Sequence, residues 1–72
     1  MNTINKETLI ANGGKYWEKG EMHRVYINMQ VVEKMDLGIN FNEKKHKLFF
    51  DCDTCKFDGS SETFARALNA NL

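Results

Sequence analysis

Hydrophobic and polar residues alternate between positions 15 and 28 in a way that predicts a β-hairpin. Two runs of strand-forming residues flank a polar stretch that contains a glycine. In the second run, Val25 and Ile27 would lie on one side of the strand, with Arg24 and Tyr26 on the other. This predicts a ribbon with one apolar face and one face that carries aromatic and basic groups.

The loop at the tip fixes the register of this hairpin. We expect a four-residue loop over Lys19–Met22. Facing residues of an antiparallel pair share a side of the sheet, so the loop also determines which side chains are neighbours. The expected pairs are Tyr16 with Val25, Trp17 with Arg24, and Lys15 with Tyr26.

Helical patterns flank this hairpin on both sides. A first short helix is predicted from Ile4 to Ala11, with Thr3 or Asn2 as its N-cap and two glycines after its end. It would cover one edge of the core. The side chains expected to do so are Ile4, Leu9 and Ile10.

Two further helices are predicted by capping residues and by apolar spacing. Asn28 is a good N-cap for a helix that runs to about Met35, and a last helix is expected from about Ser61 to Asn69. Between them, Ile39–Phe41 alternates briefly and is compatible with a strand. The inward-facing residues expected from the spacing are Met29, Val32 and Met35 in one helix and Phe64, Ala67 and Leu68 in the other.

A second hairpin is predicted over residues 47–57. Leu48, Phe50 and Cys52 share one face at period two, and a turn at Asp53–Thr54 would set Cys52 against Cys55 and Phe50 against Phe57. Both cysteines are then expected in the core as free thiols. The predicted fold is a single α+β domain over residues 1–72, in the order α-β-β-α-β-β-α, with a small antiparallel sheet of two hairpins and short helices on one face.

Composition narrows the classes of function. The chain has 72 residues, of which 42% are hydrophobic and 28% charged, and its ten basic and ten acidic residues cancel. This balance is typical of a folded protein, and it requires any attraction to nucleic acid to come from a local patch rather than an overall field. The first residues lack the apolar core of a secretion signal, and no apolar run is long enough to cross a bilayer, so we expect a cytoplasmic protein that does not bind membranes.

The cysteine spacing raises the question of a metal. Cys52 and Cys55 are two residues apart, which suits two thiolates on one Zn²⁺, and His46 and His23 would complete a set of four ligands. A second closely spaced ligand pair is missing. We therefore expect no cofactor and keep a zinc-stabilised module as an alternative.

No catalytic signature occurs in the chain. Neither histidine has a nucleophile or carboxylate at a spacing that suggests cooperation, and a domain of this size offers little concave space for a substrate. We therefore expect no enzymatic activity.

The polar face of the first hairpin is the best candidate for binding a partner. Trp17 and Tyr26 are potential anchors, and Arg24, Lys15 and Lys19 supply charge beside them, a combination that is common at protein interfaces and in nucleic-acid platforms. The alternative is intramolecular, with Trp17 packed under the N-terminal helix and Arg24 laid over it. A second possible contact is acidic and would mimic phosphates. It consists of Asp51, Asp53, Asp58 and Glu62.

Two segments of the first hairpin carry a resemblance. GKYWEK at 14–19 followed by RVYIN at 24–28 resembles a pattern in small uncharacterised proteins of phages and other mobile elements. In size, neutrality and lack of an active-site motif, the chain also resembles anti-CRISPR proteins, which typically inhibit a bacterial surveillance complex by binding it. The cysteine pair departs from the phage pattern.

The resemblance implies a non-enzymatic inhibitor of a host defence complex, acting in the cytoplasm of the host cell on a protein or ribonucleoprotein. The first alternative is a small nucleic-acid-binding regulator that uses the same basic aromatic face. The residues leave open the identity of the partner and the oligomeric state.

Overall fold

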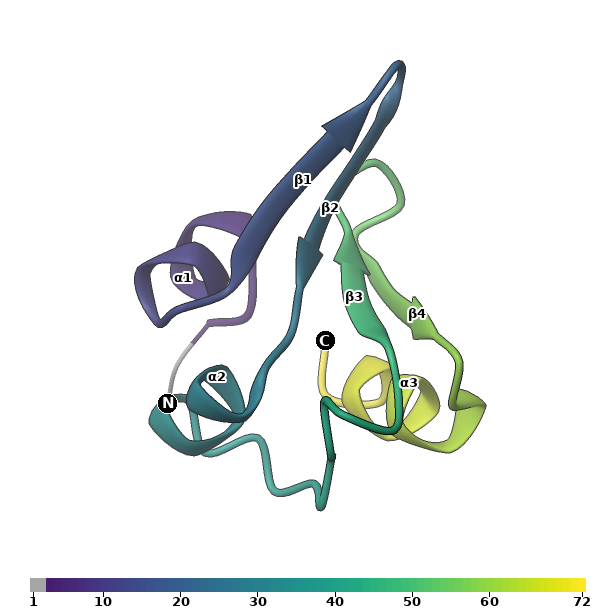
Figure 1. Ribbon diagram of the computed structural model, residues 1–72. Coiled ribbons are helices and arrows are strands. Elements are labelled where there is room, and N and C mark those ends of the chain that lie inside the picture. Colours follow the sequence, from purple (N-terminus) through teal and green to yellow (C-terminus); the bar gives the residue numbers. More distant parts are fainter. Residues whose placement is uncertain (1–2) are drawn as a thin grey trace.

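A computed structural model describes residues 3–72 and confirms the predicted order of elements (Figure 1). Four strands form one antiparallel sheet in the order β1-β2-β3-β4. Three short helices accompany it. The elements are α1 (Lys6–Ala11), β1 (Lys15–Lys19), β2 (Met22–Tyr26), α2 (Met29–Lys34), β3 (Leu48–Asp51), β4 (Lys56–Gly59) and α3 (Glu62–Asn69).

The predicted register of the first hairpin is confirmed. Tyr16 pairs with Val25, Trp17 with Arg24, and Lys15 with Tyr26. The ladder continues one pair further than expected, because Lys19 pairs with Met22. The loop therefore has two residues, Gly20 and Glu21, and not four.

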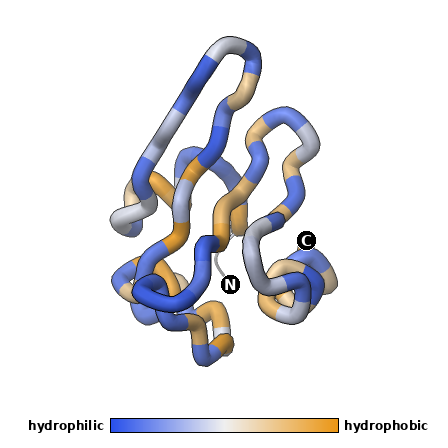
Figure 2. Tube along the Cα trace, turned by 45° about the vertical axis from the view of Figure 1, so that its right-hand side comes forward, coloured by the Kyte–Doolittle hydropathy of each residue, from blue (hydrophilic) through white to orange (hydrophobic). Residues whose placement is uncertain are grey.

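All three helices contribute to one core against one face of the sheet. On the sheet side the buried residues are Val25, Leu48, Phe50 and Phe57, which alternate with outward-facing neighbours. On the helix side they are Leu9 of α1, Val31 and Val32 of α2, and Ala65 and Leu68 of α3. Figure 2 shows that hydrophobic segments gather in the body of the molecule, whereas the projecting hairpin is largely hydrophilic.

The first helix begins later than the sequence predicts. Asn5, and not Thr3, is its N-cap, and Asn2 lies outside the described residues. The Asn5 side chain accepts a hydrogen bond from the backbone N–H of Thr8 at 2.9 Å, and the Thr8 hydroxyl accepts one from the Asn5 N–H at 3.0 Å. This reciprocal pair satisfies two first-turn amides, which favours a start at Lys6. Of the expected core residues, Leu9 is buried and Ile4 is partly buried, but Ile10 is exposed.

Asn28 caps α2 as predicted and also ties it to the segment before β1. Its side-chain oxygen accepts a hydrogen bond from the Val31 N–H at 3.0 Å, while its amide donates to the Gly13 carbonyl at 2.8 Å. The predicted inward stripe is partly wrong, because Met29 is exposed. The buried positions are Val31, Val32 and Met35. A helix of six residues is too short for its spacing alone to fix which side faces inward.

The segment between α2 and β3 forms no strand. Ile39–Phe41 was compatible with one in the sequence, but β3 already has β2 and β4 as neighbours. Phe41 is nevertheless a core residue, only 1% exposed, and packs edge-on against Phe64 with ring centroids 5.9 Å apart.

The second hairpin has a longer turn than predicted. Phe50 pairs with Phe57 as expected, but strand pairing stops at Asp51 and Lys56, and Cys52–Cys55 form a four-residue turn. The Asp51 carboxylate accepts hydrogen bonds from the N–H groups of Asp53 and Thr54, at 2.9 and 3.3 Å, and stabilises this turn. The expectation that both cysteines are core residues is wrong for Cys55, which is exposed; Cys52 is partly buried and packs against the core.

The last helix begins one residue later than predicted, at Glu62 after Ser61. Ala65 and Leu68 face the core, whereas Ala67, which the spacing placed inward, is exposed. Asn69 at the end of α3 has a further role. Its side-chain oxygen accepts a hydrogen bond from the backbone N–H of Phe57 at 2.7 Å, and its amide donates to the Phe57 carbonyl at 3.1 Å.

Within residues 3–72, no helix combines the length and the hydrophobicity needed to span a membrane.

Asn69→Ala should destabilise the fold by about 1–3 kcal/mol, because it leaves the N–H and C=O of a buried residue of β4 without partners. Asn71→Ala is the matched control, since the Asn71 amide is exposed and donates only to the Ala67 carbonyl. Urea denaturation measures both free energies of unfolding. Equal values for the two variants would contradict a role for Asn69 in holding α3 on β4.

Cys55→Gly should stabilise the fold by about 1 kcal/mol. Cys55 has a φ of 57°, in the left-handed region, where a side chain costs about 1–2 kcal/mol relative to glycine. Gly20→Ala is the opposite test, because Gly20 has a φ of 59° and open space around the missing methyl group. The Gly20→Ala variant should lose a similar free energy of unfolding in the same thermal or urea experiment. A destabilised Cys55→Gly variant would show that the thiol makes contacts that outweigh the strain.

Candidate partner interface on the open face of the sheet

The face of the sheet opposite the helices carries two rows of side chains across the strands. One row consists of Lys15, Tyr26, Phe49 and Asp58, and the other of Trp17, Arg24, Asp51 and Lys56. Each row alternates with the core row that contains Val25, so none of these residues points toward the helices. We call this surface the open face.

Arg24 lies at the centre of the open face. Its guanidinium carbon is 4.1 Å from the centroid of the Phe49 ring and 5.5 Å from that of the Trp17 ring. The Arg24 Nε atom is shielded from solvent and has no hydrogen-bond partner among the described residues. The side chain is thus held mainly by contact with aromatic rings, an arrangement worth about 0.5–2 kcal/mol for each cation–π pair.

Three aromatic rings surround this arginine. The centroids of Trp17 and Tyr26 are 6.1 Å apart at an interplanar angle of 82°, and those of Tyr26 and Phe49 are 5.6 Å apart. All four side chains are half-buried, mainly by one another and not by a helix. We call Trp17, Arg24, Tyr26 and Phe49 the aromatic–arginine cluster.

Phe49 is the member that the sequence reasoning missed. The signal was present, because placing Leu48 and Phe50 in the core at period two puts Phe49 on the opposite face. The run Leu48–Phe50 contains three consecutive apolar residues, and such a run is typical of a strand that is buried on both faces, so it did not mark Phe49 as a surface residue.

The intramolecular alternative for Trp17 is wrong in one part and right in another. Trp17 does not pack under α1, because α1 lies on the other face, where Lys6 Nζ is 4.6 Å from the centroid of the Tyr16 ring. The expected stacking of Arg24 on Trp17 is present. The rings and the arginine therefore stabilise one another while their outer surfaces stay accessible.

Charges of both signs border the aromatic–arginine cluster. The exposed cations are Lys15, Lys19 and Lys56. Asp58 is exposed at the β4 end of the row that contains Tyr26 and Phe49. A shallow hollow of about 330 Å³ lies beside the cluster. It is lined by Arg24, Tyr26, Lys47, Phe49, Asp58, Gly59 and Ser60.

The four candidate acidic residues do not form one patch. Asp51 and Asp58 lie on the open face, in different rows. Asp53 sits in the second turn, with its Oδ1 3.3 Å from His23 Nδ1, and Glu62 on α3 pairs with Arg66. These positions do not form the continuous acidic surface that phosphate mimicry requires.

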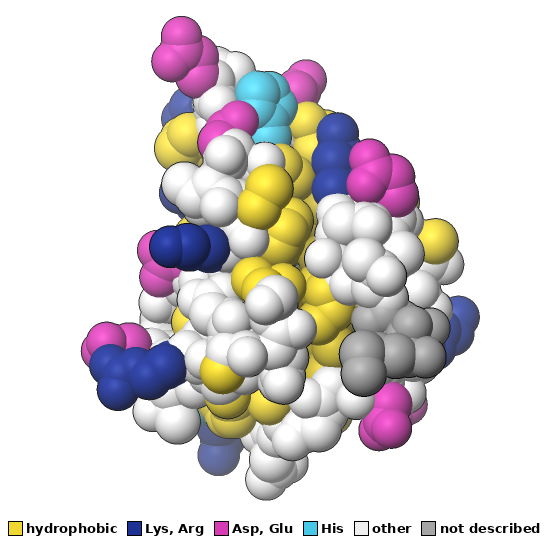
Figure 3. All heavy atoms as spheres, turned by 180° about the vertical axis from the view of Figure 1, so that it is seen from behind, with side chains coloured by type: hydrophobic (Ala, Val, Ile, Leu, Met, Phe, Trp, Pro, Cys, Tyr) yellow, Lys and Arg dark blue, Asp and Glu magenta, His cyan; other side chains and the backbone are white. Residues whose placement is uncertain are grey.

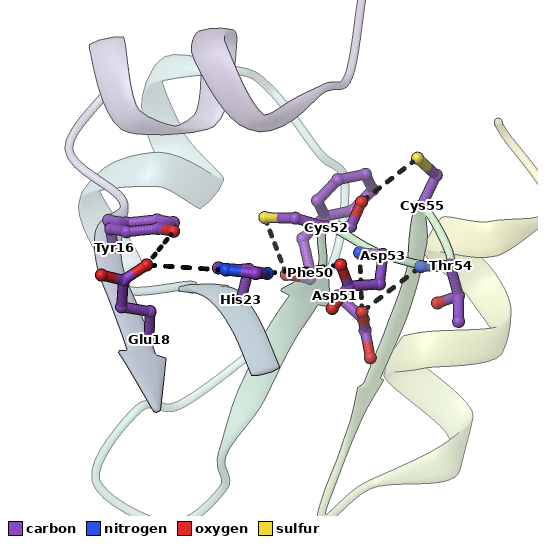
Figure 4. Close-up of polar contacts among 9 residues, drawn as sticks. All are labelled: Tyr16, Glu18, His23, Phe50, Asp51, Cys52, Asp53, Thr54 and Cys55. Atoms are coloured by element: carbon purple, nitrogen blue, oxygen red, sulfur yellow. Dashed lines mark hydrogen bonds and ion pairs between the residues drawn. The ribbon is translucent and has the colours of Figure 1, made fainter. Parts of the chain in front are cut away.

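The candidate metal ligands are also dispersed. His46 packs on Phe64 with ring centroids 5.7 Å apart, whereas His23 lies between Glu18 and Asp53, with Nε2 3.6 Å from the Glu18 carboxylate (Figure 4). Cys52 Sγ donates to the Phe50 carbonyl and Cys55 Sγ to the Cys52 carbonyl, so the thiols have different partners. No group of three or more histidine, cysteine or acidic side chains in residues 3–72 is placed to hold a metal ion.

The side of the molecule away from the open face has an apolar cleft of about 620 Å³ (Figure 3). The start of α1, the end of the chain and the second turn line it, with Phe50 and Cys52 among its residues. Burial raises the pKa of the Cys52 thiol, and the neighbouring carboxylates of Asp51 and Asp53 act in the same direction, against the opposing charge of Lys6. This thiol is therefore mostly protonated near neutral pH and a poor nucleophile.

A chain of polar contacts joins the first hairpin to the second turn on this side. The Tyr16 hydroxyl donates to Glu18 at 3.1 Å, Glu18 contacts His23, and His23 contacts Asp53 (Figure 4). Partial desolvation, followed by the hydrogen bond to Glu18, raises the pKa of Tyr16. These contacts brace the tip of the first hairpin, and none of them reaches the open face.

The chain was compared with protein-family models, with curated proteins and with solved structures, and none of the three comparisons gave a match.

Proposed function

We propose that this chain is a non-enzymatic binding protein that docks a protein partner on its open face. The observation that carries the proposal is the aromatic–arginine cluster, in which three aromatic side chains and one arginine are gathered on a sheet face that none of the helices in residues 3–72 covers. Tryptophan, tyrosine and arginine are the residue types that dominate binding energy at protein interfaces. Their mutual packing orders them before binding, which lowers the entropy cost of docking.

The geometry favours a protein over a nucleic acid as the partner. Arg24 occupies a face of both the Phe49 and Trp17 rings, so a base would have to displace it in order to stack there. Asp51 and Asp58 on the same face repel phosphates, and the chain has no net positive charge. A surface with both signs of charge around an aromatic centre is suited to a protein surface of mixed charge.

The sequence resemblance supports a narrower proposal. We infer that the partner is a protein or ribonucleoprotein complex of a bacterial defence system, and that docking blocks a working surface of that complex. The small size and the mutual packing of the aromatic–arginine cluster support this inference, because occlusion requires only contact area and shape. In this proposal Trp17 and Tyr26 are the anchors, Arg24 is the central contact, and Lys15 and Lys19 act at the rim.

Arg24→Ala and Tyr26→Ala should each weaken partner binding by about 2 kcal/mol, the range of interface hot spots. The free energy of unfolding should fall by about 1–2 kcal/mol, because each variant loses contacts with neighbouring rings but leaves the core intact. The partner is recovered from host lysate on the immobilised wild-type chain, identified by mass spectrometry and then titrated against each purified variant.

Glu33→Ala is the matched control for this experiment. Glu33 is exposed on α2, on the far side of the sheet, so its loss should leave both binding and stability unchanged. Loss of stability in the Arg24 and Tyr26 variants with unchanged affinity would show that the cluster only supports the fold.

The dependence of binding on salt distinguishes a nucleic-acid partner from the proposed protein partner. A fluorescein-labelled single-stranded DNA or RNA should bind the chain weakly or not at all at physiological ionic strength. Tight binding that falls steeply as salt is raised would overturn the preference for a protein partner, because direct phosphate contacts release counterions.

A further inference from the structure

The two edges of the sheet differ in how their backbone groups are satisfied. At the β4 edge, the outward N–H and C=O of Phe57 are both bonded by the side chain of Asn69, which takes the place of a neighbouring strand. At the β1 edge, four of the five side chains are exposed, and none of the described helices lies along the projecting half of the strand (Figure 1). The β4 edge is closed at its centre, whereas the β1 edge remains available.

The hydrogen-bonding pattern of β2 shows which groups of β1 point outward. The His23 carbonyl accepts from the Cys52 N–H at 2.9 Å, and the Ile27 N–H donates to the Leu48 carbonyl at 2.8 Å. Residues 23, 25 and 27 therefore face β3, and the alternate residues of β2 face β1. Because Trp17 pairs with Arg24, the backbone groups of Tyr16 and Glu18 point away from β2. No backbone hydrogen bond within residues 3–72 reaches these outward groups.

The side chains along this edge restrict what could pair with it. Lys15, Trp17 and Lys19 share the open face at period two. If a second copy paired antiparallel about Trp17, Lys15 of each chain would face Lys19 of the other, and like charges opposite each other destabilise a sheet. A strand with acidic residues at the two outer positions and an apolar residue between them has the complementary pattern.

We propose that the β1 edge receives an extended acidic segment of the protein partner as a fifth strand of the sheet. In that segment an acidic, an apolar and an acidic residue alternate, facing Lys15, Trp17 and Lys19, and its backbone bonds the outward groups of Tyr16 and Glu18. This proposal rests on the proposed function and specifies the partner, because such a strand would extend the open face beside the aromatic–arginine cluster. Backbone pairing supplies affinity, and the two lysines select the sequence.

The probe is a fluorescein-labelled peptide, Ser-Glu-Thr-Val-Thr-Glu-Ser, compared with a peptide in which both glutamates are lysines. The first readout is backbone amide hydrogen exchange measured by NMR at saturating peptide. Exchange should slow at the amides of Tyr16 and Glu18 with the acidic peptide, because these N–H groups gain acceptors. An unchanged exchange rate at both amides would overturn the proposal.

The second readout is a charge swap in the chain. The double variant Lys15→Glu with Lys19→Glu should bind the acidic peptide about tenfold more weakly, since two favourable cross-strand pairs become repulsive. It should also bind the lysine peptide more tightly than the wild-type chain does. Lys34→Glu with Lys44→Glu is the matched control, because it changes the net charge equally at exposed positions in α2 and in the loop before β3. Equal effects of the two double variants would show a non-specific charge effect and overturn the proposal.

The outcomes separate this proposal from the proposed function. If the peptide leaves the Tyr16 and Glu18 amides unaffected but Arg24→Ala still weakens partner binding, the edge pairing is wrong and the open-face interface stands. If the peptide protects both amides but Arg24→Ala leaves partner binding intact, the partner uses the edge and not the cluster. Protection of these amides in the chain alone, rising with its concentration, would identify a second copy as the occupant and overturn the proposal.

Discussion

The structure depends on one constraint, which is that a chain of 72 residues has too little helix to cover both faces of a four-stranded sheet. The helices contain six, six and eight residues, and all three pack on the same face. The opposite face must therefore be stabilised by its own side chains. The aromatic–arginine cluster does this, because each ring and the guanidinium cover part of their neighbours.

Period-two patterning explains why much of the fold could be predicted from the sequence. In the first hairpin, Val25 and Ile27 alternate with Arg24 and Tyr26, and a tip turn that contains glycine leaves one plausible register. The same pattern places Trp17, Arg24 and Tyr26 on one face of the sheet. Local capping chemistry predicted α2, because Asn28 offers an acceptor to the first-turn amides whatever surrounds it.

The features that could not be predicted depend on contacts between distant segments. The spacing of α3 suggested Ala67 as a core residue, but its packing on β4 places Ala65 there. The turn at Cys52–Cys55 is set by hydrogen bonds from Asp53 and Thr54 to the Asp51 side chain, which compete with the shorter turn that the spacing favours. The candidate zinc ligands also depend on distant contacts, since His23 lies between Glu18 and Asp53 whereas His46 packs on Phe64.

The available β1 edge and the open face of the sheet together indicate how the proposed binding can be specific in a chain with no net charge. Attraction at long range requires excess charge of one sign, and this chain has none. Selection must instead occur at contact, through groups held in fixed positions. Phe49 and Trp17 hold the guanidinium of Arg24, and the pairing of β1 with β2 fixes the backbone positions from which Lys15 and Lys19 project. In the proposed function, a partner is recognised by the spacing of its own apolar and acidic groups, and the sheet sets the matching spacing on this chain.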